Sequence, residues 1–146
     1  MKTTTAALPV MILFASPVMA QKTYTPATGT AERKAILNIM REDFYRSPAA
    51  AARNAENVLL VVHHLRIKGR WILVHATPTI SGKPVAEPRW ALIQKSGNQF
   101  HNRHFRRAIS AYLTRDNEHL AYEMNSLTVR LIHRAFPTCP PEIFPS

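Results

Sequence analysis

Hydrophobic positions recur at helical spacing in the stretch that follows residue 30. One face of this stretch would carry four apolar side chains: Ile36, Leu37, Met40 and Phe44. Thr30 stands immediately before it as a suitable N-cap, and Pro48 marks its end. The pattern therefore predicts an amphipathic helix with one buried face, followed by an alanine-rich connection over residues 49–57.

Residues 58–67 and 70–77 are rich in Val, Leu and Ile and flank Lys68-Gly69, which predicts a β-hairpin. With Lys68-Gly69 as a two-residue loop, Ile67 would lie opposite Arg70. The face expected to meet the helix then collects Val61, His63, Leu65, Ile67, Ile72, Val74 and Ala76.

The other hairpin face would carry the remaining side chains: Leu60, Val62, His64, Arg66, Trp71, Leu73, His75 and Thr77. In this register Arg66 lies across from Trp71, so that its guanidinium can stack on the indole ring. His64 and His75 would be diagonal neighbours on this face. A loop one residue longer would exchange the two faces, because side chains alternate along a strand.

Residues 89–95 predict a third strand, and the pattern then becomes helical again. Two further stripes have helical spacing: Phe105, Ala108, Ile109, Tyr112 and Leu113, then Leu127, Leu131, Ile132 and Phe136. Ser126 is the expected cap of the second, and Pro137 its stop. Residues 137–146 hold several prolines and should be extended, with Ile143 and Phe144 docked on the body.

These elements predict an α+β fold. An N-terminal helix packs on a small antiparallel sheet of about three strands, followed by one or two C-terminal helices and a proline-rich tail. Residues 1–20 are expected to be a secretory signal peptide, with Lys2 before an apolar stretch and small residues at a cleavage site after Ala20. Residues 21–146 would then form a single domain, periplasmic or secreted, without a transmembrane segment.

Charge narrows the range of partners. Removing Lys2 from the 19 Lys and Arg leaves 18 against 9 Asp and Glu, a net charge of +9 for the mature part. Such a protein attracts an acidic envelope protein or an anionic envelope surface, and nucleic acid is a less favoured partner. Cys139 is the single cysteine, so no internal disulfide exists, and it is interpreted as a spare or dimer-forming thiol.

Part of the chain resembles a known group of proteins. Residues 31–37, AERKAIL, are followed by Leu65-x-Ile67-x-Gly69-x-Trp71-x-x-Val74 and then by Pro78-x-x-x-Gly82. This combination resembles a group of small exported bacterial proteins of unassigned function, over roughly residues 29–85. The shared motifs are packing motifs, so the resemblance supports the fold and transfers no catalytic residue. After Trp90 the sequence departs from that group.

Several polar residues are candidates for chemistry. His101 and His104 would share one face of a helix, a spacing compatible with a metal site. His64 and His101, with Lys95, could act as the acid, base and phosphate-binding cation of a nuclease. The candidate binding residues are Arg66, Trp71, His64, His75, Arg103, Arg106 and Arg107. No residue is assigned a catalytic role, and no cofactor is expected.

The preferred hypothesis is a small exported envelope protein that acts as a non-catalytic binding or accessory module, such as an inhibitor or immunity protein. Its basic surface would meet an acidic partner. A secreted histidine-dependent nuclease or hydrolase and a periplasmic metal-binding protein are the alternatives.

Overall fold

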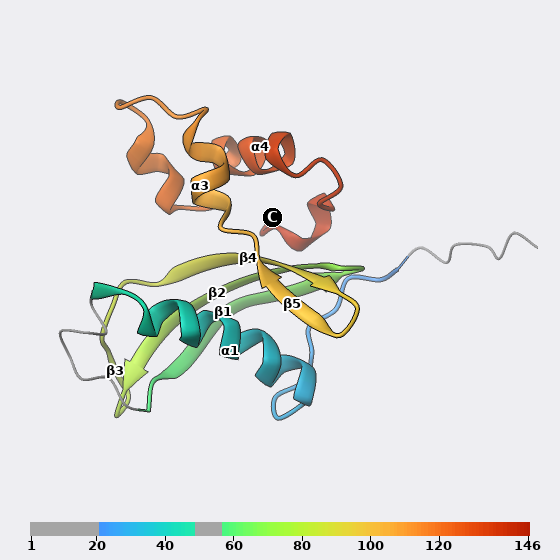
Figure 1. Ribbon diagram of the computed structural model, residues 1–146, viewed down its shortest axis with the longest axis vertical. Coiled ribbons are helices and arrows are strands. Elements are labelled where there is room, and N and C mark those ends of the chain that lie inside the picture. Colours follow the sequence, from blue (N-terminus) through green and yellow to red (C-terminus); the bar gives the residue numbers. More distant parts are fainter. Residues whose placement is uncertain (1–20, 49–56) are drawn as a thin grey trace, which may run out of the picture.

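A computed structural model describes residues 21–48 and 57–146 (Figure 1). The expected signal peptide and most of the alanine-rich connection lie outside the described residues. The described chain forms helices and one antiparallel sheet of five strands, which confirms the α+β class. The strands are β1 (Leu59–Lys68), β2 (Trp71–Ile80), β3 (Lys83–Pro84), β4 (Arg89–Ser96) and β5 (Gln99–Asn102).

The strand order is β1-β2-β4-β5, and the short β3 pairs with β2. The three expected strands correspond to β1, β2 and β4. The sheet is wider than expected because β5 folds back along β4, with Gln94 paired to His101. Gly97, at φ +59°, lies in the turn between them. A strand therefore occupies residues for which the sequence predicted none, and it sets the position of everything that follows.

Helices cover both faces of this sheet (Figure 1). α1 (Ala31–Tyr45) lies on one face. The other face is covered by the C-terminal layer: α3 (Phe105–Ser110), η1 (Glu118–Tyr122), α4 (Ser126–Ala135) and η2 (Pro141–Ile143). None of the helices in the described part of the chain combines the length and the apolarity needed to span a bilayer.

α1 forms as the sequence predicts. The Thr30 hydroxyl accepts a hydrogen bond from the backbone N–H of Arg33 at 3.3 Å and so caps the first turn. The buried side chains of the helix are the four expected ones: Ile36, Leu37, Met40 and Phe44. The first three pack on the sheet in a core shared with β1, β2 and β4. Local periodicity is sufficient here because one face alone decides the packing.

The register of the hairpin differs from the expected one. Gly69 and Arg70 form the turn, with Gly69 at φ +61°, so Lys68 pairs with Trp71 and Ile67 with Ile72. The expected pairing of Ile67 with Arg70 is wrong. The shift between the two registers is even, so the residues that face α1 are unchanged at this end of the hairpin. They are Leu65, Ile67, Ile72, Val74 and Ala76, all buried against the helix.

A β-bulge changes the other end of β1. The register shifts between Val62 and His64, so Leu60 and Val62 pack toward the α1 core in place of Val61 and His63. Val61 is 50% exposed. Placing Val61 and His63 against the helix was therefore wrong, because the sequence gives no sign of the extra residue.

The expected stacking of Arg66 on Trp71 is also wrong. Arg66 pairs with Leu73 and is exposed. Trp71 is only 7% exposed and lies edge-on to Phe136, with ring centroids 5.8 Å apart, inside the core beneath the C-terminal layer. Trp71 thus belongs to the packing of the molecule.

The C-terminal layer partly follows the predictions. α4 is present, but its cap is Asn125, whose side-chain oxygen accepts from the Thr128 N–H at 2.9 Å; the expected cap, Ser126, is its first residue. Ile143 and Phe144 are 0% and 5% exposed, which confirms that the tail docks on the body. The expected fully extended tail is interrupted by η2.

Candidate functional site

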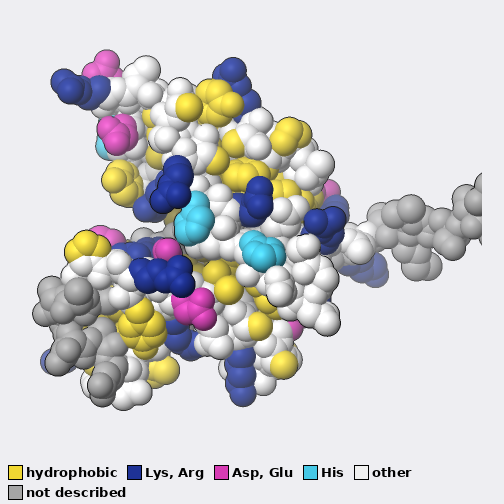
Figure 2. All heavy atoms as spheres, in the orientation of Figure 1, with side chains coloured by type: hydrophobic (Ala, Val, Ile, Leu, Met, Phe, Trp, Pro, Cys, Tyr) yellow, Lys and Arg dark blue, Asp and Glu magenta, His cyan; other side chains and the backbone are white. Residues whose placement is uncertain are grey.

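An open cleft of about 1080 Å³ lies between the α1 side of the sheet and the C-terminal layer. Figure 2 shows the molecule indented on one side, with basic, acidic and histidine side chains gathered around the indentation. α1, the start of β4, the residues around the start of α3 and the end of η1 supply its walls. Its charged side chains are Asp43, Glu87, Arg89, Arg106, Arg107 and Glu123.

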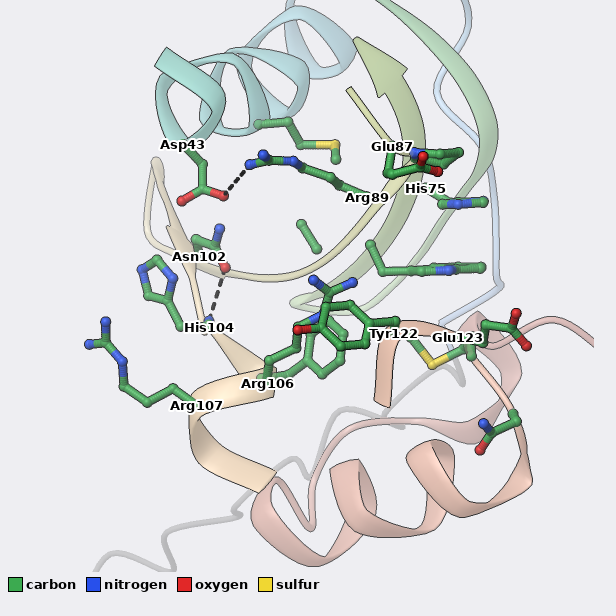
Figure 3. Close-up of a pocket in the computed structure, with 17 residues that line it drawn as sticks. Asp43, His75, Glu87, Arg89, Asn102, His104, Arg106, Arg107, Tyr122 and Glu123 are labelled. Carbon is green, nitrogen blue, oxygen red and sulfur yellow. Dashed lines mark hydrogen bonds and ion pairs between the residues drawn. The ribbon is translucent and has the colours of Figure 1, made fainter. Parts of the chain in front are cut away.

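Arg106 is the central cation of this cleft (Figure 3). Its guanidinium carbon lies 4.8 Å from the centre of the Tyr122 ring and 5.9 Å from that of Phe105. Two aromatic rings therefore restrict the side chain and contribute cation–π attraction. Its Nε is buried and has no hydrogen-bond partner among the described residues.

The electrostatic environment of Arg106 favours an added anion. Burial lowers the pKa of Arg106; Tyr122 opposes that shift, Arg89 adds to it, and Asp43 opposes it. Asp43 is also the ion-pair partner of Arg89, at 4.0 Å. Arg106 forms no ion pair within residues 21–48 and 57–146. Two guanidinium groups thus share one carboxylate, and an anion bound here would relieve their repulsion.

Aromatic and imidazole rings form a second part of the cleft wall. His75 stacks on Trp90 with ring centroids 4.1 Å apart and planes within 2°, and both line the cleft. Behind them, the ring of His63 lies 5.2 Å from that of His75, and His64 lies 5.5 Å from Trp90. The bulge in β1 and the direct pairing of His64 with His75 bring these histidines together.

The inner histidines are tied into the fold. His64 Nε2 lies 2.7 Å from the carbonyl oxygen of Ile143, which can only accept, so Nε2 carries the proton. Burial lowers the pKa of His64, the Ile143 carbonyl opposes this, and Arg66 adds to it. Burial also lowers the pKa of His75, with the neighbouring His63 and His64 acting in the same direction.

These shifts predict a pH-dependent stability. Because the folded-state pKa of both histidines lies below the unfolded value of about 6.5, the unfolded chain takes up protons first as the pH falls. The associated stability is complete above about pH 6.5, is lost as the pH falls through that value, and levels off below the folded pKa. Urea unfolding between about pH 7.5 and pH 5.5, where carboxylates stay ionised, should show the decline.

The matched variants separate this effect from general acid sensitivity. His75→Gln should flatten the slope of unfolding free energy against pH, whatever it does to the absolute stability. His119→Gln, at an exposed position of η1, should leave the slope as it is. A slope that is the same in wild type and His75→Gln would contradict the assignment.

The structure places three of the candidate binding residues in the cleft: His75, Arg106 and Arg107. Four others lie elsewhere: His64 and Trp71 beneath the C-terminal layer, Arg66 on the exposed side of β1, and Arg103 with its guanidinium 5.5 Å from the Phe136 ring. Sequence reasoning did not select Asp43, Glu87, Arg89, Tyr122 or Glu123 as site residues. They come from separate elements, and no spacing along the chain unites them.

The histidine pairs expected from the sequence do not form as supposed. His101 lies in β5 and His104 in the residue before α3, at φ +45°, so a shared helix face is wrong. Within residues 21–48 and 57–146 no group of three or more His, Cys, Asp or Glu side chains could hold a metal ion. His64 and His101 are on β1 and β5, three strand spacings or about 14 Å apart. That separation is too large for an acid–base pair acting on one bond.

Cys139 is likewise removed from chemistry at the surface. It is 3% exposed and packs in the core of the C-terminal layer. Burial raises the pKa of its thiol to about 12, so the thiolate needed for nucleophilic attack does not form near neutral pH.

Comparisons with family models, curated proteins and solved structures found no match for this chain.

Proposed function

We propose that this protein is an exported, non-catalytic binding module of the bacterial envelope, periplasmic or secreted, which receives a carboxylate of an acidic protein partner in the cleft at Arg106. The observation that carries the proposal is the state of Arg106. Its guanidinium lies between two aromatic rings in the cleft wall, and its Nε has no partner among the described residues.

A carboxylate is the group that this arrangement suits. The planar guanidinium presents parallel N–H donors that match the two oxygens of a carboxylate. Because Tyr122 and Phe105 already restrict the side chain, less rotamer entropy is lost when the bond forms. A hydrogen bond to a charged group contributes about 1.5–3 kcal/mol. The net charge of +9 outside the signal peptide raises the encounter rate with acidic proteins.

Equilibrium dialysis against a pool of capped peptides tests this proposal. Each peptide has a blocked amino end, a blocked carboxyl end and one glutamate among neutral residues, and mass spectrometry reads the retained species. Arg106→Met keeps the apolar stem and removes the donors, so it should reduce retention about tenfold or more. Arg106→Lys should give an intermediate value, because it keeps the charge and loses the fork.

The control is Arg130→Met, which removes the same charge from an exposed position of α4. It should bind the peptides as wild type does, apart from a small change that disappears as salt is raised. Equal retention by wild type, Arg106→Met and Arg130→Met would contradict the proposal. A pull-down from envelope extract with wild type and Arg106→Met would then identify the natural partner, as the protein retained only by wild type.

A further inference from the structure

The charges of the cleft are segregated. Figure 3 shows Arg107 and His104 on one side, Glu87 and Glu123 on the other, and Arg106 between them. Arg89 and Asp43 lie toward the basic side and form an ion pair with each other. Neither glutamate forms an ion pair within the described residues. One end of the cleft is therefore cationic and the other anionic.

We infer that the cleft binds a short zwitterionic peptide, with its terminal carboxylate at Arg106 and its terminal ammonium group between Glu87 and Glu123. This inference rests on the proposed function, because it assigns the carboxylate received at Arg106 to the end of a peptide chain. It adds a second recognition point, the ammonium group, which the proposed function does not require.

The two glutamates are placed to receive one cation jointly. Glu87 precedes β4, and Glu123 follows η1, so they reach the cleft from the sheet and from the C-terminal layer respectively. Both side chains are exposed, so they stay ionised at neutral pH without a large desolvation cost. A ligand ammonium group between them is attracted by both charges and holds the two layers to a common ligand.

The wall between the charged ends suits the body of a peptide. The His75–Trp90 stack offers a flat aromatic surface, and Met40 and Met124 add flexible apolar side chains. The volume of about 1080 Å³ exceeds the upper part of the usual small-molecule range, about 300–1,000 Å³, so several residues fit.

A long polyanion suits the cleft less well. The lining holds three arginines and three carboxylates, so its formal charge is balanced. A nucleic acid or polyphosphate lying along the cleft would meet Glu87 and Glu123, and like charges in contact oppose binding. The positive net charge of the molecule brings anionic ligands near, and the cleft then selects those that also carry a cation.

Three peptide pools distinguish the inference from the function on which it rests. All contain short random sequences of neutral residues; one has both ends free, one is N-acetylated, and one is C-amidated. Equilibrium dialysis with mass spectrometry compares their retention by wild type. The free pool should be retained most, and blocking either end should lower the association constant about tenfold, a charged hydrogen bond's worth of discrimination.

The variants assign each end. In the double variant Glu87→Gln/Glu123→Gln, the N-acetylated pool should bind as well as the free pool, while the preference for a free carboxylate persists. In Arg106→Met the preference for a free carboxylate should disappear. Glu42→Gln, an exposed position on α1 outside the cleft, should behave as wild type.

The outcomes separate cleanly. If wild type retains the N-acetylated pool as well as the free pool, and Arg106→Met still loses both, the peptide inference is wrong and the proposed function stands. If no pool is retained and the capped glutamate peptides are not retained either, both are wrong. Equal retention of all three pools through a site insensitive to Arg106 would likewise overturn both.

Discussion

Replacing Trp71 by alanine is expected to lower the free energy of unfolding by about 3–5 kcal/mol. The indole is 7% exposed and packs edge-on against Phe136 beneath the C-terminal layer. Its removal loses apolar burial and leaves a cavity that α4 and the tail, held by other contacts, fill only partly. Urea unfolding followed by far-UV circular dichroism measures the change, and the midpoint should fall with little change in the slope of the transition.

Arg66→Ala is the matched control, because the sequence alone assigned Arg66 and Trp71 to one surface pair. Arg66 is exposed and pairs with Leu73 across the hairpin, so its loss should alter the free energy of unfolding by no more than about 0.5 kcal/mol. Two equally small effects would mean that Trp71 lies on the surface and that the register described here is wrong.

The contrast between α1 and the hairpin shows which features a sequence can specify. The buried face of α1 depends only on the spacing of its own apolar side chains, and all four expected residues are buried. The hairpin depends on which residues occupy the turn. Lys68-Gly69 and Gly69-Arg70 both contain the glycine that takes φ +61°, so the pattern did not decide between them.

Side-chain alternation limited the damage from that error. The two registers differ by an even number of positions, so the residues facing α1 near the turn were assigned correctly. The bulge after Val62 had no such protection, because one extra residue moves the following side chains to the opposite face. The contacts among His63, His75 and Thr77 that follow from the bulge were therefore not foreseen.

The cleft was less predictable still. Its arginines could be suspected from the basic run of residues 103–107, and Arg106 and Arg107 were indeed selected. Its acidic end could not, since Glu87 and Glu123 are isolated in sequence and meet only because β5 and α3 turn the chain back over the sheet. Segregation of charge in the cleft is thus a product of tertiary structure, while net charge is a property of composition.

The tail contributes to this arrangement because it closes the C-terminal layer against the sheet. His64 on β1 donates to the carbonyl of Ile143, and the Ile143 side chain enters the same core as Ile132 and Leu73. The last residues of the chain therefore connect the edge strand to the layer that carries Arg106. Loss of that connection should be felt in the stability of the whole layer.

Ile143→Ala is accordingly expected to lower the free energy of unfolding by about 2–5 kcal/mol, because the side chain is 0% exposed and its removal leaves a cavity next to Ile132. The neighbouring Glu142→Ala is the control: Glu142 is exposed and pairs only with Lys68 at the surface, so the urea midpoint should scarcely move. The same midpoint for both variants would show that the tail does not pack against the sheet. If it does, the Ile143→Ala protein should also lose protection of the α4 amides in hydrogen exchange before those of β2, since the C-terminal layer depends on the tail and the opposite core does not.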